Sequence, residues 1–442
     1  MPDRPDPGFA HEPPRRRDRP RGLRGLLRVL GPGLITGASD DDPSGIGTYS
    51  QVGSQFGFGL LWTALFTFPL MTAVQELCAR IALETGQGLG ASLRRKFPRW
   101  LVGLAVLGLL VANTINVGAD LGAVAAGGAL LSRGALKTIW LVVPVAALIL
   151  GMQIFASYDT IFKIFKWLTL ALFAYVVSAI YAHPDLREVL WATFVPHVEF
   201  SREFITAMVA VFGTTISPYL FFWQASSEVD ELAQAGRVTE NRRRGCRTSD
   251  LRAARTDVVI GMFFSNLVMY FIILTTAAVL HAHGKTDIQT ADQAAAALAP
   301  LAGPFAFIVF ALGMIGAGLL AIPILSGSAT YAVKEFLGLR GSLRSSPRQG
   351  LIFYGMLSAA TVAGVAINFL HIDSIRALFW TAVINGVVAP PLLVLIVLLG
   401  SDRRIMRTRV SGWLSRSLTW ATTGVMALAA VTMIGFLLLP QK

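Results

Sequence analysis

The chain has 442 residues, of which 54% are hydrophobic and 14% are charged, and its mean hydropathy is +0.60. Soluble globular domains carry about 25% charged residues, so this composition argues against a soluble protein and indicates an all-α integral membrane protein. The formal net charge of +12 does not imply a nucleic-acid partner, because the basic residues gather in alternate loops. Two cysteines, Cys78 and Cys246, do not suggest a disulfide framework or a zinc site.

Residues 1–22 are rich in Pro and Arg and almost free of apolar side chains. We expect a disordered cytoplasmic tail there and no signal peptide, because no uninterrupted apolar run with a cleavage site follows. Hydropathy and helix breakers then predict about eleven membrane-spanning helices. They lie near residues 25–55, 58–84, 101–131, 137–156, 165–182, 203–227, 256–281, 302–333, 350–370, 375–399 and 414–438.

The first predicted span is interrupted by Asp40, Asp41, Asp42, Pro43, Ser44 and Gly45. Each carboxylate would cost about 2.5 to 3.5 kcal/mol at the centre of a membrane helix. Pro43 removes a backbone donor and Gly45 frees φ, so we expect the helix to break where the charges lie. Broken helices in membranes are tolerated where they are buried in protein or line a cavity, which predicts an ion or solute site.

The same residues allow a plainer interpretation. Asp42 followed by Pro43 is an ordinary helix start, with an acidic N-cap and a proline at the first helical position. Residues 26–41 would then form a solvated hinge outside the membrane, and the first span would cover residues 46–72.

The basic residues of the loops predict the orientation of the chain. The loops expected inside contain Arg94, Arg95, Lys96, Arg99, Lys163, Lys166, Arg237, Arg242, Arg243, Arg244, Arg247, Arg252, Arg255, Arg340, Arg344, Arg348, Arg403, Arg404, Arg407 and Arg409. The other loops carry scattered bases such as Arg133, Lys137, Arg187 and Lys285. The positive-inside rule therefore predicts a cytoplasmic N-terminus and an external C-terminus. The basic run 237–255 would also suit phospholipid binding, although orientation alone explains it.

A second break lies in the sixth span, where residues 212–219 read FGTTISPY. The two breaks are five spans apart, and because five is odd, a second five-helix unit must enter from the opposite side of the membrane. Interrupted helices in matching positions of inverted halves point to a transport site at the midplane. We therefore expect one repeat over 23–183, its inverted partner over 200–400, and an eleventh helix over 412–438.

Several segments resemble the natural resistance-associated macrophage protein (Nramp) family of divalent-metal transporters. They are GPGLITGASDDDPSGIGTYSQ (31–51), FGFGLLW (56–62), QELCARIALETGQGL (75–89), ADLGAV (119–124), ALAPLAG (297–303), SGSATYAVKEFLG (326–338), VVAPPLLVLIVLL (387–399) and SDRRIM (401–406). The resemblance runs in order through nearly the whole chain after the tail. It implies a LeuT-like inverted repeat with broken helices 1 and 6, in a multi-pass protein of the bacterial inner membrane. We expect a monomer without a cofactor.

The resemblance assigns site residues but also shows departures at the metal ligands. Asp42 matches the metal-binding Asp of the family, whereas Gly45 stands where the family has a ligand Asn. Ser217 stands where the family has its ligand Met, and Thr214 where a small residue supplies a carbonyl. Tyr219 replaces a His linked with proton movement.

The proton route implied by the family is also altered. Asp120 matches a proton-pathway Asp, but Ala123 replaces the Glu one turn later. The Arg of the ninth span that would partner Asp120 is absent, with Tyr354 near its place. We therefore expect weak or absent proton coupling, with Asp120 as the one candidate left of the pathway.

Without the soft thioether, the ligands that remain are oxygens. The metal set comprises Asp42, Asp41, Gly45, Thr214 and Ser217, with Asp40, Ser44 and Tyr219 in an outer shell. Mg²⁺ keeps several waters around one or two carboxylates, so a wide, acidic site without sulfur favours Mg²⁺, with Mn²⁺ as the second candidate. In losing the Met, the chain resembles the Nramp-related magnesium transporters.

Two other functions can be compared with the same sequence. A symporter of a small organic solute would use the same fold, but the acidic cluster would repel a substrate carboxylate. A membrane enzyme is disfavoured because the spans contain no nucleophile–base pair, metal-ligand cluster or phosphate-cradling glycine loop.

Overall fold

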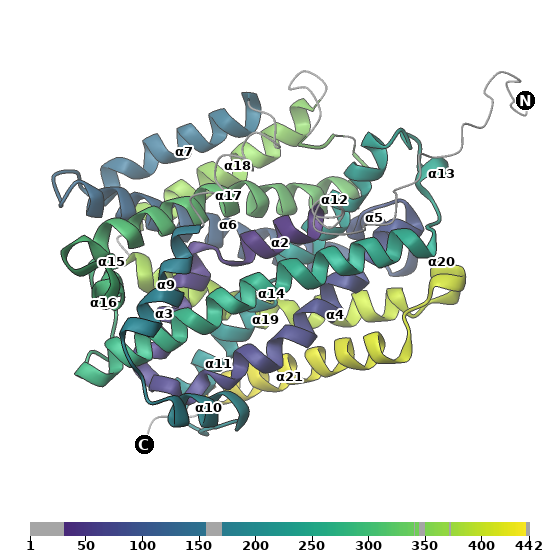
Figure 1. The fold of residues 1–442 in the computed structure, drawn as a ribbon. Coiled ribbons are helices and arrows are strands. Elements are labelled where there is room, and N and C mark those ends of the chain that lie inside the picture. The colour runs from purple at the N-terminus through teal and green to yellow at the C-terminus, as the bar shows by residue number, and fades with distance from the viewer. Residues whose placement is uncertain (1–30, 156–169, 340, 344–349, 371–372, 439–442) are drawn as a thin grey trace, which may run out of the picture.

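The structure is a computed structural model that describes residues 31–155, 170–339, 341–343, 350–370 and 373–438. Throughout these ranges the chain is helical and has no strand, as Figure 1 shows. The expected tail, residues 1–22, lies outside the described residues. The all-α class expected from composition is confirmed.

Helices of eight or more residues carry the architecture. They are α2 (Pro32–Asp40), α3 (Pro43–Phe56), α4 (Trp62–Thr85), α5 (Leu89–Lys96), α6 (Arg99–Leu131), α7 (Thr138–Phe155), α9 (Ala174–Tyr181), α10 (Leu186–Phe194), α11 (Arg202–Thr215), α12 (Pro218–Gln234), α14 (Thr248–Val279), α17 (Ala306–Leu337), α18 (Leu351–Ile367), α19 (Ser374–Gly400) and α21 (Trp413–Leu438). Short helices connect them: α13 (Glu240–Arg243), α15 (Ala291–Ala295), α16 (Ala299–Ala302) and α20 (Arg403–Met406).

Within the described residues, eight helical segments are long and apolar enough to cross a membrane. The pair Pro43–Leu60 and Trp62–Thr85, which bends by 107°, is a further candidate, and Ala171–Tyr181 is a shorter apolar helix. The eleven-span assignment uses α2 and α3 as the two halves of the first span, α4 as the second, and Ala171–Tyr181 as the end of the fifth. Residues 165–169 of that fifth span lie outside the described ranges.

Several helices extend beyond the predicted spans. α12 continues to Gln234 and α14 begins at Thr248, seven residues after and eight residues before the expected limits. The added turns are polar, with residues such as Asp230, Glu231 and Arg252, so hydropathy alone did not include them. They carry the helices past the apolar layer.

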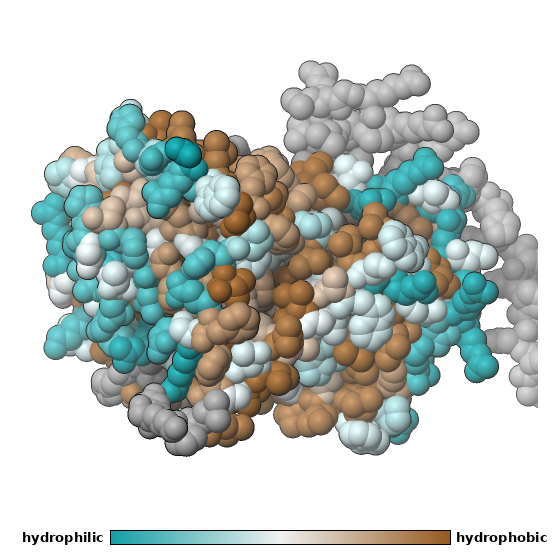
Figure 2. Space-filling view, turned by 90° about the horizontal axis from the view of Figure 1, so that it is seen from below, coloured by the Kyte–Doolittle hydropathy of each residue, from teal (hydrophilic) through white to brown (hydrophobic). Residues whose placement is uncertain are grey.

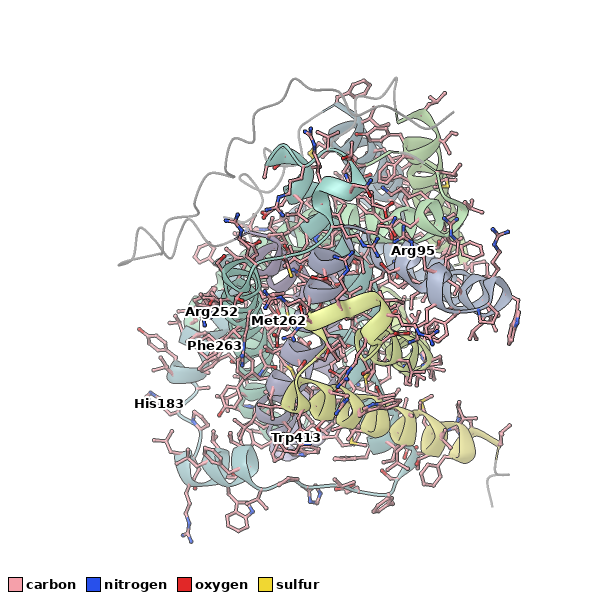
Figure 3. All side chains as sticks on the ribbon, turned by 90° about the vertical axis from the view of Figure 1, so that its right-hand side faces the viewer. Arg95, His183, Arg252, Met262, Phe263 and Trp413 are labelled. Atoms are coloured by element: carbon pink, nitrogen blue, oxygen red, sulfur yellow. The ribbon has the colours of Figure 1, made fainter. Side chains whose placement is uncertain are left out.

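Polar side chains mark the two ends of the helix bundle. Figure 2 shows a hydrophobic band between hydrophilic ends, as expected for a protein that crosses a lipid bilayer. In Figure 1, α5, α13 and α20 gather at the right-hand end, whereas α15 and α16 lie at the left-hand end. Figure 3 views the right-hand end directly and labels Arg95 and Arg252 there.

Ion pairs fasten the short helices of this basic end together. Arg95 on α5 pairs with Glu240 of α13 at 2.6 Å, and Lys96 pairs with Asp402, the N-cap of α20. The hydrogen bond from Lys96 holds the pKa of Asp402 below its ordinary value. The ends of distant helices are thereby joined outside the apolar layer.

The first half of the broken span is held by α14. Gly33 and Gly37 of α2 lie so close to α14 that an added side chain would collide with the backbone near Val258 and Gly261. Such small-residue contacts are how membrane helices approach each other closely. The Asp257 carboxylate of α14 accepts hydrogen bonds from the backbone N–H groups of Gly31 and Gly33, at 2.9 and 2.7 Å. A carboxylate from another helix therefore caps the start of α2.

Candidate metal site

The first span breaks at the carboxylates, as expected. α2 ends at Asp40 and α3 begins at Pro43, so Asp41 and Asp42 lie between two helix ends. Asp42 is the N-cap of α3, and its Oδ1 accepts a hydrogen bond from the Gly45 N–H at 2.7 Å. The ordinary helix start considered above is therefore real, but the solvated hinge is wrong, because Asp40, Asp41 and Asp42 are 0%, 6% and 1% exposed.

The second oxygen of Asp42 faces two other helices. Oδ2 accepts from the Asn116 amide of α6 at 3.4 Å and from the Tyr219 hydroxyl of α12 at 3.3 Å. Tyr219 also donates to the Ser39 carbonyl at the end of α2, at 2.8 Å. Tyr219 therefore bridges both sides of the first break from the second broken helix.

Asp40 and Asp41 lie on a different side. The hydroxyl of Ser265 on α14 donates to Asp40 Oδ2 at 2.6 Å and approaches Asp41 Oδ1 at 3.5 Å. The three consecutive carboxylates therefore divide into two groups, with Asp42 between α6 and α12 and the other two near α14. Among the described residues, no three His, Cys, Asp or Glu side chains converge as a metal-binding group. A metal held here would need hydroxyl, amide or carbonyl oxygens in addition to a carboxylate.

The second break meets the first. α11 ends at Thr215 and α12 begins at Pro218, and the Thr214 hydroxyl lies 3.2 Å from the Ser44 hydroxyl of α3. Ser217, the N-cap of α12, donates its hydroxyl to the carbonyls of Gly213 and Thr214 at 2.9 and 2.7 Å. The structure thus brings together Asp42, Ser44, Thr214 and Tyr219. Ser217 lies at the start of α12, the helix that carries Tyr219.

Gly45 is surrounded closely. A Cβ added at this position would lie 3.2 Å from a ring carbon of Tyr49 and 3.3 Å from the Asp40 carbonyl oxygen. Contacts this short require neighbouring atoms to shift, so an Asn side chain would fit only after a small local rearrangement. The backbone N–H of Gly45 is occupied by Asp42.

A sulfur that was not predicted from the sequence lies beside the second break. Met269 Sδ on α14 lies 3.5 Å from the Thr215 hydroxyl, which also contacts the Tyr49 hydroxyl at 3.0 Å. Tyr49 is seven residues after Asp42 on α3, about 10 Å along the helix axis. Met269 therefore belongs to the α3–α11–α14 contact beyond Asp42.

Asp120 is fully buried on α6 and faces Asp42 and the backbone of Ser44. Among the described residues, neither of its carboxylate oxygens has a hydrogen-bond partner of good geometry. Ala123, in the next turn, offers no polar group. The Tyr354 hydroxyl donates to the Leu343 carbonyl at 3.1 Å.

Two contacts at the site were not predicted from the sequence, those of Asn116 and Ser265. Both residues lie in long apolar helices, away from the two breaks and from the positions matched by the family. A regular polar face along α6, with Asn113, Asn116 and Asp120 at helical spacing, was the signal available.

Two broken helices that meet at buried polar groups, within a bundle of apolar helices, define a multi-pass membrane transporter of the LeuT type. The profile of the family described as natural resistance-associated macrophage protein-like matches residues 33–435. The chain therefore belongs to the Nramp family of divalent-metal transporters.

Individual relatives agree with this assignment. The chain is 24% identical over 405 residues to the divalent metal cation transporter MntH of Klebsiella pneumoniae, covering 90% of this chain and 92% of the relative. It is 27% identical over 350 residues to MntH of Deinococcus radiodurans, covering 76% and 77%.

Solved structures show the same fold. The manganese transporter of Eremococcus coleocola has a TM-score of 0.71 at 18% identity, covering 96% of this chain and 91% of that one. Mhp1, a nucleobase-cation-symport-1 family transporter, has a TM-score of 0.58 at 14% identity, covering 92% and 91%. The fold is therefore shared with a transporter of a different family.

Proposed function

We propose that this protein carries divalent cations across the membrane by alternating access, with Mg²⁺ favoured and Mn²⁺ the second candidate, and that it belongs with the Nramp-related magnesium transporters. The observation that carries the proposal is the environment of Asp42, whose carboxylate accepts hydrogen bonds from the Gly45 N–H, the Asn116 amide and the Tyr219 hydroxyl. Hard cations prefer carboxylate, carbonyl and water oxygens, whereas thioethers favour softer ions.

Ser217 supports an oxygen shell at the position of the missing methionine. Because its hydroxyl hydrogen is directed to the carbonyls of α11, the lone pairs of its oxygen remain available to a cation or to a water molecule. We assign Asp42, Ser217 and Thr214 as the core of the metal site, and Asp41 and Gly45 complete the metal set, Gly45 through the backbone N–H that holds Asp42. Asp40, Ser44 and Tyr219 form the outer shell.

The same geometry suits a partly hydrated ion. Mg²⁺ dehydrates reluctantly and usually keeps several waters while one or two carboxylates bind it. Ser217 is smaller than Met, so it leaves room for a water where a Met side chain would bind directly, whereas Gly45 is closely surrounded. Manganese remains the second candidate because related proteins are described as manganese transporters.

An organic solute is the alternative substrate, favoured by the structural likeness to Mhp1. Three buried carboxylates at the breaks would repel an anionic solute but would accept a cationic one. Competition of organic cations with divalent-cation uptake separates this alternative from the main proposal.

Replacing Asp42 tests the site assignment. We predict that Asp42→Ala lowers Mg²⁺ and Mn²⁺ uptake into proteoliposomes by at least about tenfold, because a hard cation loses its carboxylate. Asp292→Ala, an exposed acid on α15, is the control and should transport at the wild-type rate. Undiminished uptake of every divalent cation by Asp42→Ala would show that the site is assigned wrongly.

Restoring sulfur tests the choice of ion. Ser217→Met should shift the ratio of Cd²⁺ or Mn²⁺ uptake to Mg²⁺ uptake upward by about tenfold, since a thioether binds softer ions. Ser227→Met, ten residues or about 15 Å further along α12, is the matched control. Gly45→Asn is a poorer test, because its Cβ is crowded by Tyr49. An unchanged selectivity in Ser217→Met would argue against the softness argument.

We propose that proton coupling is weak or absent, because Asp120 has no acidic neighbour at Ala123 and Tyr219 stands in place of the family's His. At a fixed membrane potential, Mg²⁺ uptake should leave the internal pH of proteoliposomes unchanged. The measurement uses an internal pH dye, with a protonophore as a positive control for the dye. Internal acidification in proportion to cation uptake would contradict this proposal.

We propose that the basic end of the bundle faces the cytoplasm, in a monomer with inverted repeats over 23–183 and 200–400 and an eleventh helix over 412–438. In a cysteine-free background, an impermeant maleimide applied to whole cells should label His283→Cys at once. Ser249→Cys, exposed beside the basic residues, should be labelled only after permeabilisation. The reverse pattern would invert the orientation.

A further inference from the structure

A polar face runs along α6 beside the broken span. Asn113, Asn116 and Asp120 follow one another at helical spacing and are at most 1% exposed. Asn113 Oδ1 and Asn116 Oδ1 have no hydrogen-bond partner among the described residues, and the carboxylate oxygens of Asp120 have none of good geometry, although the Ser44 backbone lies nearby. Buried polar atoms in native proteins nearly always have a partner, so these oxygens are candidates for contacts with a ligand.

Asn116 lies directly against the candidate site. Its amide nitrogen donates to Asp42 Oδ2 at 3.4 Å, while its amide oxygen is unpaired. Rotation of the amide by half a turn exchanges the two atoms and would direct the oxygen toward the Asp42 carboxylate. Asn116 is therefore a donor to Asp42 in one orientation and an oxygen ligand in the other.

Asp120 adds a second charge one turn along the same helix. It faces Asp42 and the Ser44 backbone, and no salt bridge within the described ranges involves either carboxylate. Two buried carboxylates that interact without a positive partner repel each other. A cation between them would remove this repulsion, and an amide oxygen beside it would complete a shell that hard divalent ions prefer.

We propose that the metal site extends onto α6, where Asn116 supplies the amide oxygen that Gly45 lacks and Asp120 holds a water of the bound cation. This inference rests on the proposed function and deepens it. The site then takes its ligands from three segments, the α2–α3 break, the α11–α12 break and α6. Asp120 serves cation binding in place of proton transfer.

Asn113 provides a matched control on the same helix. It is an equally buried Asn one turn away, but its amide nitrogen donates to the Leu325 carbonyl of α17 at 3.2 Å. It has the same chemistry, but its amide is directed to the backbone of another helix, whereas the amide of Asn116 is directed to Asp42. Loss of its amide should affect helix packing without changing cation binding.

The test measures the Mg²⁺ concentration that half-saturates thermal stabilisation of the purified full-length protein, with Mg²⁺ uptake as a second readout. We expect Asn116→Ala and Asp120→Asn to raise this concentration by about tenfold. Mutation of a residue that holds a metal ligand or a bound water in place commonly weakens metal binding by at least this factor. Asn113→Ala should leave it unchanged even if the melting temperature without Mg²⁺ falls. Asp42→Ala should show no saturation.

Asn116→Asp separates a ligand from a hydrogen-bond donor. If Asn116 acts through its oxygen, the Asn116→Asp variant should bind Mg²⁺ better than Asn116→Ala, because Asp has nearly the same size as Asn and restores a side-chain oxygen. If Asn116 only donates to Asp42, Asp would be worse than Ala, since two carboxylates would face each other, and the inference would be overturned.

The two levels of the argument fail differently. In the first case, wild type binds Mg²⁺ and Asp42→Ala does not, but Asn116→Ala and Asp120→Asn are half-saturated at the same Mg²⁺ concentration as Asn113→Ala. This result would overturn the inference and leave the proposed function standing. Wild-type protein that shows no saturation with either Mg²⁺ or Mn²⁺ would overturn both.

Discussion

The burial of three consecutive carboxylates at a helix break is the constraint on which the rest of this structure depends. A carboxylate removed from water must receive hydrogen bonds or a positive charge, or it is unstable. Here Asn116 and Tyr219 donate to Asp42 from other helices, and Ser265 donates to Asp40 from α14, while the Gly45 N–H of the helix that Asp42 caps is a local donor. The break is thus stable only inside the complete bundle, which explains why a site and a fold arise from the same residues.

Close helix contacts make these donors available. Gly213 of α11 lies against the backbone of α19 near Ala382 and Gly386, and Gly33 and Gly37 hold α2 against α14. A larger side chain at these positions would separate the helices and move Thr214 or Asp40 away from their partners. The buried carboxylate of Asp257 has an architectural role, because it accepts hydrogen bonds from N–H groups at the start of α2. Buried acids in this protein therefore serve both architecture and the candidate site.

The two breaks, and the place of Asp42 between the halves of the first, could be predicted from the sequence. Prolines, glycines and charges within an apolar run have few interpretations. Asn116 and Ser265 were not predicted, since their importance depends on which helix lies opposite and no local pattern encodes that. The division of the acids into an Asp42 side and an α14 side was likewise beyond sequence reasoning, because three adjacent residues at a helix end can point in several directions. The polar ends of α12 and α14 were missed because hydropathy detects only the apolar part of a helix.

A transporter without proton coupling would still have an energy source. Each elementary charge that crosses the membrane gains about 2.3 kcal/mol per 100 mV, so a divalent cation entering a negative cell gains about 4.6 kcal/mol. Since about 1.4 kcal/mol corresponds to a tenfold ratio, this potential alone sustains a concentration ratio of about a thousandfold or more. If the replacement of the family's His and Glu by Tyr219 and Ala123 abolishes proton coupling, as we propose, the membrane potential still allows the protein to accumulate the ion. Under the same proposal, selectivity would come from the oxygen groups around Asp42, where Ser217 and Gly45 replace the family's Met and Asn.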